Sequence, residues 1–271
     1  MNRLLSTYGL TRPPFSKDLP ASEMLQTDHS QEILLGLKAA IEGRTSAVLT
    51  GDSGSGKTCL IRALAGDLPE GRYRLLYTAN ATVNRRDFYR QISLGMGLEP
   101  HSSFAALYAS VSQHIRDLAT QHKLRVILVC DESHMLPIQV LEQLHVLMNF
   151  EQDSKPWLSI ILVGLPDLRE TLKRNVLASL ASRIPMRLHL PPLDSDQVKA
   201  YVRHRMTAAG CRRDVFSEDA LLLMARATAG LMRRIDLLAD HCLAIAMKAR
   251  ATIIDASVVQ KAIQVAGDSL L

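Results

Sequence analysis

The chain has 271 residues, enough for one large domain or two small ones with a substantial core. Apolar residues make up 47% of it, which excludes a disordered chain, and the apolar runs 126–130 and 160–163 are too short to cross a bilayer. The four cysteines lack CxxC spacing and no secretory signal opens the chain, so we expect a cytoplasmic protein without zinc or disulfides. The net charge of +5 suits nucleic-acid binding but also an ordinary basic surface.

Strand and helix patterns alternate through the first two thirds of the chain. Residues 1–29 carry two proline turns and are predicted to be irregular, and a helix is expected over about 31–42. The alternation that follows predicts a parallel sheet covered by helices on both faces. The strands are expected at 46–50, 74–78, 126–130, 159–163 and 186–190, and the helices at 57–67, 85–96, 104–121, 138–150 and 167–180.

The pair Pro191-Pro192 ends this alternation. The remaining sequence has only helical patterns, over 195–209, 217–227, 231–248 and 256–265. We therefore predict an α/β fold with a five-stranded parallel sheet, followed by a small all-helical lid domain. The expected parts are an irregular N-terminal segment 1–29, an α/β P-loop domain 30–192 and a helical domain 193–271.

A glycine-rich stretch follows the first predicted strand. Residues 51–58, GDSGSGKT, match GxxxxGK[ST] between a strand and a helix, so a chance Gly/Ser loop is the weaker interpretation. Backbone N–H groups of such a loop surround phosphates, Lys57 reaches the β- and γ-phosphates, and the Thr58 hydroxyl coordinates Mg²⁺. The predicted cofactor is ATP with Mg²⁺, and the residues expected to bind it here are Gly51, Asp52, Ser53, Gly54, Ser55, Gly56, Lys57, Thr58 and Cys59.

The apolar strand predicted at 126–130 ends in two acids. Asp131 is expected to hold Mg²⁺ through water, and Glu132 to orient and deprotonate the attacking water. The alternative is an acidic helix cap, which the phosphate loop upstream makes less favoured. His134, two residues further on, is interpreted as structural.

The order and spacing of these motifs resemble those of AAA+ ATPases, in particular the ExeA-like branch. That branch includes secretion-accessory ATPases and ATPases encoded beside transposases, akin to the TniB, TnsC and MuB regulators. The resemblance covers nearly the whole chain. Beyond the phosphate loop, the segments that carry it are YGL at 8–10, PFS at 14–16, DESHML at 131–136, LMNFE at 147–151, LVGLPDL at 162–168, LASRI at 180–184, LPPL at 190–193 and GLMRRIDLL at 230–238.

The resemblance implies roles for two arginines. Arg183 matches the finger arginine that reaches a neighbouring subunit's site, although a surface ion pair is the alternative. Arg233 matches the lid arginine that contacts the nucleotide of its own chain, and Arg234 beside it is a second candidate. A finger acting between subunits implies a homo-oligomer, either a ring or a helical filament.

Three positions depart from or extend the family pattern. The polar sensor usual after Leu-Val-Gly is Leu165 here, so either another residue such as Asn149 replaces it or hydrolysis is slow. Met232 stands where proline is usual, which we expect to matter little. Asn80 is a weaker candidate for a residue that pairs with Glu132 and holds it inactive.

The leading functional hypothesis is a DNA-associated transposon ATPase that assembles with ATP on double-stranded DNA and recruits or activates a transposase. Secretion-type relatives continue past the lid into a membrane segment, whereas this sequence stops there, so we expect no membrane partner. Arg85 and Arg86 are the candidate DNA contacts, with Arg44 and Lys155 weaker, although a solvated helix start is the slightly favoured explanation of the first pair. The alternative is a switch ATPase that acts only on protein partners, as an ExeA-like secretion accessory. A small-molecule kinase is poorly supported.

Overall fold

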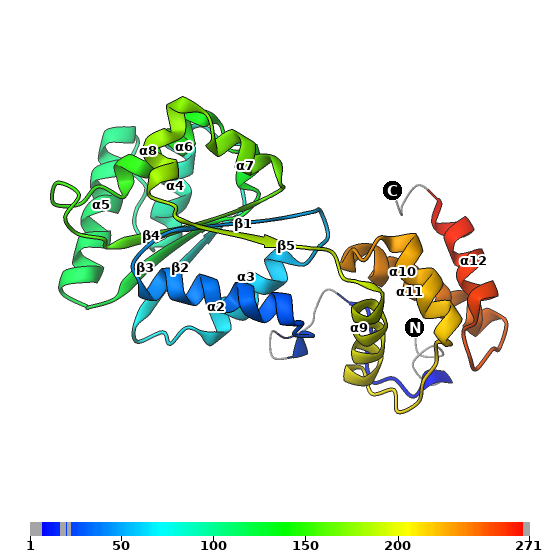
Figure 1. The fold of residues 1–271 in the computed structure, drawn as a ribbon. Coiled ribbons are helices and arrows are strands. Elements are labelled where there is room, and N and C mark those ends of the chain that lie inside the picture. Colours follow the sequence, from blue (N-terminus) through cyan, green and yellow to red (C-terminus); the bar gives the residue numbers. More distant parts are fainter. Residues whose placement is uncertain (1–6, 17–19, 21–22, 268–271) are drawn as a thin grey trace. The chain divides into compact units, whose positions relative to one another are not determined.

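The computed structural model describes residues 7–16, 20 and 23–267 (Figure 1). Within them the chain forms two compact units. The α/β unit comprises Asp28–Gly51 and Leu60–Leu190, and the helical unit comprises the described residues before Asp28 and after Leu190 together with the segment Asp52–Cys59. The phosphate loop thus groups with the C-terminal helices, a feature that no sequence pattern indicates.

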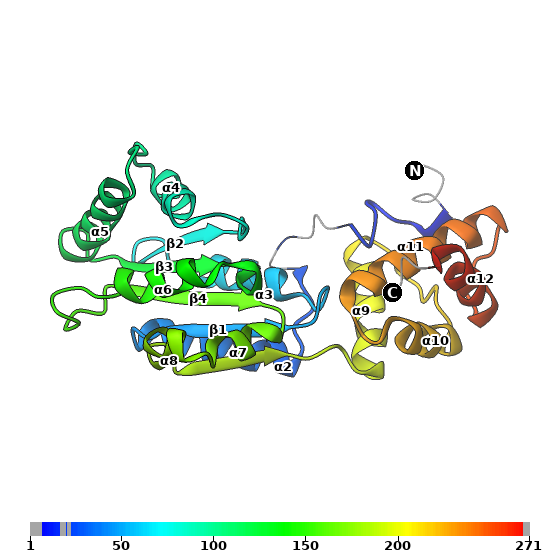
Figure 2. The same ribbon diagram turned by 90° about the horizontal axis from the view of Figure 1, so that it is seen from above.

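The α/β unit contains the predicted five-stranded parallel sheet. Its strand order is β2-β3-β4-β1-β5, and every neighbouring pair is parallel (Figure 2). All carboxyl ends therefore meet at one edge of the sheet, here called the carboxyl edge, and all starts meet at the opposite, amino edge. The strands are β1 (Ala47–Gly51), β2 (Tyr73–Thr78), β3 (Arg125–Cys130), β4 (Leu158–Gly164) and β5 (Met186–Leu190).

Helices cover both faces of this sheet because the central strands are apolar on both sides. Val126 and Leu128 of β3 face a core shared with α4, α5, α6 and α8, whereas Ile127 and Val129 face the core of α2 and α3. The helices on the two faces are α2 (Asp28–Glu42), α3 (Lys57–Asp67, whose first turn belongs to the helical unit), α4 (Arg85–Gly95), α5 (Phe104–Thr120), α6 (Ile138–Leu147), α7 (Asp167–Leu172) and α8 (Ala178–Ser182).

One predicted helix, 167–180, is interrupted. Arg174 has an extended backbone, with φ −64° and ψ 136°, and a short 3-10 turn, η3 (Asn175–Leu177), separates α7 from α8. The predicted helix 138–150 also ends early at Leu147, and residues 151–153 all adopt positive φ angles before β4 begins.

The helical unit contains α9 (Ser195–Ala208), α10 (Glu218–Thr228), α11 (Met232–Lys248) and α12 (Ala256–Ala266). Side-chain caps start three of them: a capping box between Asp194 and Gln197 opens α9, Ser217 caps α10 and Asp255 caps α12. Three residues of the N-terminal segment, Tyr8, Leu10 and Phe15, are buried in the same core. No helix in the described part of the chain has the length and apolar character needed to cross a membrane.

Candidate nucleotide-binding site

The phosphate loop leaves β1 at Gly51 and enters α3 at Lys57. Gly54 and Gly56 have φ angles of +80° and +101°, which side chains other than glycine rarely adopt. Space is also lacking, because a Cβ at Gly54 would lie 2.8 Å from the Cβ of Arg233, and one at Gly56 would lie 2.8 Å from the sulfur of Met232. Backbone conformation therefore requires glycine at both positions, and at Gly54 the close approach of the Arg233 Cβ also leaves no space.

Polar groups inside the loop fit an anionic ligand. Lys57 is buried, and its ammonium donates to the carbonyl of Asp52 at 2.9 Å, so its charge is held within the loop. The Ser55 side chain is only 2% exposed, and its hydroxyl has no hydrogen-bond partner among the described residues. A buried hydroxyl without a partner, beside a lysine and at the start of an 11-residue helix, is a donor set that suits phosphate oxygens. Thr58, the predicted Mg²⁺ ligand, and Cys59 are exposed.

Arg233 lies against this loop within the helical unit. Its backbone N–H donates to the carbonyl of Gly54 at 3.2 Å, and its guanidinium donates to the Ser53 hydroxyl at 3.4 Å. The backbone N–H of Arg234 instead donates to Leu231, inside the first turn of α11. The structure therefore brings Arg233, the first of the two predicted candidates, to the phosphate loop.

The acid pair lies at the carboxyl edge of the α/β unit. Asp131 is 4% exposed, and both of its oxygens accept hydrogen bonds: Oδ1 from the backbone N–H of Glu132 at 2.9 Å, and Oδ2 from the hydroxyl of Tyr77 at 2.7 Å. Tyr77 belongs to the neighbouring strand β2 and is a residue that the sequence analysis missed. Only the strand order and register reveal that it reaches Asp131.

Glu132 adopts a left-handed backbone, with φ 53° and ψ 32°, and half of its side chain is exposed. Its carboxylate oxygen Oε2 lies 3.5 Å from Nδ1 of His134, which stands in the 3-10 turn η2 (Ser133–Met135). Asn80 forms no hydrogen bond with Glu132 among the interactions of the described residues. His134, interpreted from sequence as structural, is thus the side chain beside the predicted base.

The two residues considered for the polar sensor, Leu165 and Asn149, lie at opposite edges of the sheet. Leu165 follows β4 at the carboxyl edge, and its backbone N–H donates to His134 Nδ1 at 3.4 Å. Asn149 lies between the end of α6 and the start of β4, at the amino edge. The suggestion that Asn149 replaces the missing polar sensor is therefore wrong, because the length of β4 separates it from Leu165.

Arg183 also lies at the amino edge. It caps α8, just before β5, whose first residue Met186 pairs with Ala47 at the start of β1. Its guanidinium forms an ion pair with Asp153, a half-exposed carboxylate in the loop before β4. The surface ion pair considered as the alternative to a finger is therefore present in the single chain.

The basic residues considered for DNA contact do not share one surface. Arg85 and Arg86 are exposed in the first turn of α4, just past the carboxyl end of β2, and the Arg85 guanidinium lies 5.6 Å from the centre of the Phe104 ring. Arg44 and Lys155 are exposed in the turns that precede β1 and β4, at the amino edge.

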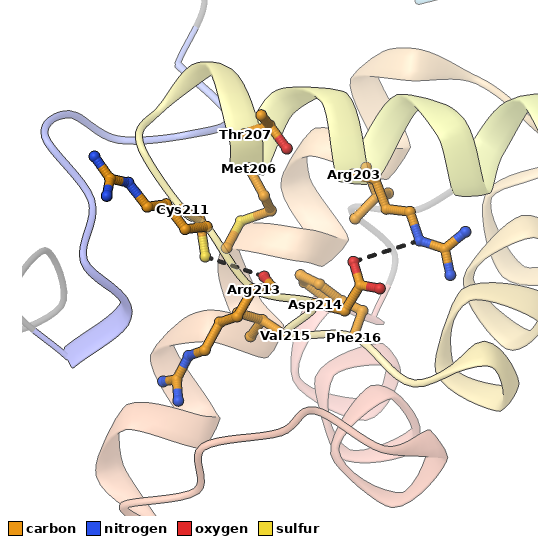
Figure 3. A pocket seen from close by; sticks show the side chains of 10 residues that line it. Arg203, Met206, Thr207, Cys211, Arg213, Asp214, Val215 and Phe216 are labelled. Carbon is orange, nitrogen blue, oxygen red and sulfur yellow. Dashed lines mark hydrogen bonds and ion pairs between the residues drawn. The ribbon is translucent and has the colours of Figure 1, made fainter.

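A pocket of about 250 Å³ in the helical unit is a weaker candidate site (Figure 3). The end of α9 and the segment 211–216 line it. Two of its arginines already have partners: Arg203 lies 3.7 Å from Asp214 and pairs with Glu218, and Arg213 donates to the carbonyl of Thr7 at 3.3 Å. None of the predicted nucleotide-binding residues lines this pocket.

Among the described residues, no three His, Cys, Asp or Glu side chains cluster as a metal site. Mg²⁺ bound with a nucleotide does not require such a cluster, because it keeps several waters and takes one or two protein ligands together with phosphate oxygens.

Comparison with known proteins supports the fold. Residues 40–172 match the family model described as an AAA domain. The chain is 34% identical over 239 residues to General secretion pathway protein A of Aeromonas hydrophila, an alignment that covers 87% of this chain and 43% of that protein. The chain therefore spans less than half the length of this relative. The sequence identity over most of this chain supports the resemblance to the ExeA-like branch.

Several solved structures share the fold. Cdc6p of Pyrobaculum aerophilum superposes with a TM-score of 0.72 at 18% identity, covering 93% of this chain and 70% of that one. ORC1 of Aeropyrum pernix in complex with DNA gives 0.69 at 19% identity, with 93% and 68% covered, and the RuvB Holliday junction branch migration motor of Thermotoga maritima gives 0.61 at 21%, with 94% and 73% covered. Together with the AAA domain matched over residues 40–172, this architecture confirms the predicted AAA+ P-loop fold and supports the predicted ATPase class.

Proposed function

We propose that this chain binds ATP with Mg²⁺, assembles with further copies of itself, and hydrolyses ATP where two copies meet. The observation that carries the proposal is the position of Arg183 at the amino edge, whereas β1 ends and the phosphate loop begins at the carboxyl edge. The five residues of β1 separate these edges by about 13 Å. An arginine at the amino edge suits the site of a neighbouring copy better than the site of its own chain.

In this proposal the residues of the site divide the work of hydrolysis among them. Backbone N–H groups of the loop and the Lys57 ammonium bind the β- and γ-phosphates. Thr58 and, through water, Asp131 would hold Mg²⁺, which offsets the phosphate charge. Glu132 orients the attacking water and accepts its proton, while Arg183 of the neighbouring copy stabilises charge on the γ-phosphate.

Complementation between two inactive variants tests this arrangement. Lys57→Ala should lose ATP binding, whereas Glu132→Gln and Arg183→Ala should each bind ATP without turning it over. A mixture of the last two should regain part of the turnover, because some junctions then pair an intact Glu132 with an intact Arg183. Full activity of Arg183→Ala alone, or an inactive mixture of two variants that still assemble, would refute a shared site.

We further propose that the assembled ATPase associates with double-stranded DNA through Arg85 and Arg86. Both guanidinium groups are exposed in the first turn of α4, where the helix dipole is positive and cations are unfavourable. The acid of that turn, Asp87, already has a partner: its carboxylate accepts a hydrogen bond from the Asn84 side-chain amide, and its backbone N–H donates to Asn84 Oδ1. A cationic pair kept at such a position suits an external anion such as the DNA backbone. One protein of the same fold, ORC1 of Aeropyrum pernix, is described in complex with DNA.

The DNA proposal is tested by the salt dependence of binding to a random duplex, with and without a non-hydrolysable ATP analogue. Arg85→Ala with Arg86→Ala should lower the slope of log K against log salt by about 1.8, since each phosphate contact contributes about 0.9. Arg226→Ala, which removes an exposed arginine of α10, is the matched control and should leave the slope unchanged. An unchanged slope in the double variant would remove this surface from consideration.

The similarity to General secretion pathway protein A favours a second candidate, an accessory ATPase that acts on protein partners in secretion. A chain that hydrolyses ATP but binds no duplex, with or without nucleotide, would support this candidate over DNA association. Regulation of transposition and a transposase partner rest on the family resemblance alone. Nucleotide-dependent binding of a transposase encoded beside this chain would be their test.

A further inference from the structure

Tyr77 lies where the edge strand β2 reaches the carboxyl edge of the sheet. It pairs with Val129 of β3, and Asp131 comes two residues after Val129, just past the end of that strand. Side chains two positions apart point to the same face, and an aromatic side chain can reach the diagonal neighbour on the adjacent strand. The register therefore brings the Tyr77 hydroxyl to Asp131, at 2.7 Å from Oδ2.

The ring of Tyr77 is not needed to fill the core. Leu76 and Tyr73 of the same strand are buried, whereas Tyr77 is 47% exposed. Its hydroxyl donates to Asp131, the carboxylate expected to serve the metal. A role in orienting Asp131 explains a half-exposed tyrosine better than packing does.

Two donors hold the Asp131 carboxylate from both sides. The backbone N–H of Glu132 donates to Oδ1 and Tyr77 donates to Oδ2, so rotation of the carboxylate about its last bond is restricted. An ionised carboxylate oxygen accepts more than one hydrogen bond, so these donors leave capacity for a metal-bound water. Partners of this kind fix the direction of a metal-binding group, and their removal typically costs 10- to 100-fold in metal affinity.

We propose that Tyr77 is a positioning residue that orients Asp131 toward the magnesium of bound nucleotide. This inference rests on the proposed role of Asp131 and adds a residue from the neighbouring strand to it. In this role Tyr77 acts through Asp131 and not on the nucleotide itself, so its removal should weaken Mg²⁺ binding without weakening the binding of metal-free nucleotide.

Tyr77→Phe removes the hydroxyl and keeps the ring. Calorimetric titration of Mg²⁺ into the full chain saturated with ADP should show an affinity about tenfold weaker than in the wild type, while the affinity for ADP without Mg²⁺ stays the same. Excess Mg²⁺ should restore most of the ATP turnover. The matched control is Tyr108→Phe, which removes a hydroxyl bonded to the carbonyl of Val146 in the same unit and should leave Mg²⁺ binding unchanged.

Asp131→Ala separates this inference from the proposal on which it depends. Mg²⁺ affinity that is unchanged in Asp131→Ala would overturn the metal role of Asp131 itself. If Asp131→Ala weakens Mg²⁺ binding and Tyr77→Phe does not, only the role of Tyr77 fails. Equal weakening of ADP binding with and without Mg²⁺ in Tyr77→Phe would also overturn it, because that pattern indicates a general structural effect.

Discussion

Arg205 provides the sharpest test of how the N-terminal segment is held. This arginine of α9 is 5% exposed, and its guanidinium donates to the carbonyls of Pro14 and Ser16 at 2.8 and 2.6 Å. It also donates to the Tyr201 hydroxyl at 2.8 Å and lies 3.6 Å from Asp236. We expect Arg205→Met, which keeps an unbranched apolar chain, to detach residues 14–16 and destabilise the helical unit.

The size of the expected stability loss follows from the charge of Asp236, which loses its partner when Arg205 is replaced. Removing one partner of a buried ion pair costs about 3–5 kcal/mol, because the other charge stays uncompensated. The side chain of Asp236 keeps 22% exposure and still accepts from Tyr201 at 2.8 Å, which places the loss at the lower end. We therefore expect the free energy of unfolding to fall by about 3 kcal/mol at neutral pH.

The loss should depend on pH in a defined direction. Burial raises the pKa of Asp236 to about 6, and Arg205 and the Tyr201 hydroxyl partly oppose this. Because the folded pKa lies above the unfolded value, the folded state binds the proton more tightly, and stability falls as pH rises through about 6. Without Arg205 the pKa of Asp236 rises further, and so does that of Asp240, which Arg205 also lowers. The loss should thus be larger at about pH 8 than at about pH 5.

Urea unfolding followed by far-UV circular dichroism measures this loss of stability. The Thr11 amide donates to the carbonyl of Ala209 at 2.8 Å, so its hydrogen exchange reports on the attachment of the N-terminal segment. Arg205→Met with Asp236→Asn is the companion variant, and it should be more stable than Arg205→Met at about pH 8 because no buried charge remains. A loss below about 1 kcal/mol, or an equal loss at both pH values, would refute the reasoning.

Three further predictions concern the nucleotide site. Gly54→Ala should weaken ADP binding about tenfold in calorimetry, since a left-handed alanine costs about 1–2 kcal/mol and its Cβ meets Arg233; an unchanged Kd would show that this loop conformation is not the one that binds phosphate. Asp153→Asn removes the competitor for Arg183 and should lower the protein concentration at half-maximal turnover by up to about fivefold, whereas a rise would mean that Asp153 supports assembly. His134→Phe keeps a ring but loses the acceptor for the Leu165 N–H, so we expect a lower kcat with unchanged ATP affinity, partly recovered in His134→Asn; a normal kcat would leave His134 structural.

Local sequence patterns were sufficient for the sheet and for the phosphate loop. The strand β3 is apolar throughout because it is buried on both faces, and Gly54 and Gly56 are needed for positive φ angles that are set within a few residues. The interruption at Arg174 was not predictable, since the apolar spacing on both sides of it continues a helical pattern.

Contacts between distant segments could not be predicted. Tyr77 reaches Asp131 only because β2 and β3 are neighbours in a particular register, and strand order and register between these distant segments were not among the features that local patterns predicted. Residues 8–16 look irregular by themselves, yet Arg205, almost two hundred residues later, binds their carbonyl groups. The assignment of Asn149 as a substitute sensor failed for a similar reason, because only the strand order shows which edge a loop occupies.

The positions of Glu132 and Arg183 restrict how copies of the chain can assemble. Glu132 lies at the carboxyl edge of the sheet, and Arg183 lies at the amino edge. If Arg183 completes a neighbour's site, each junction joins the carboxyl edge of one copy to the amino edge of the next. In a two-fold dimer one self-complementary patch would have to contain both Arg183 and the site that it completes, although these lie at opposite edges of the sheet. A head-to-tail contact meets the requirement with two different patches, and its repetition gives a closed ring or an open helical filament, depending on its rotation.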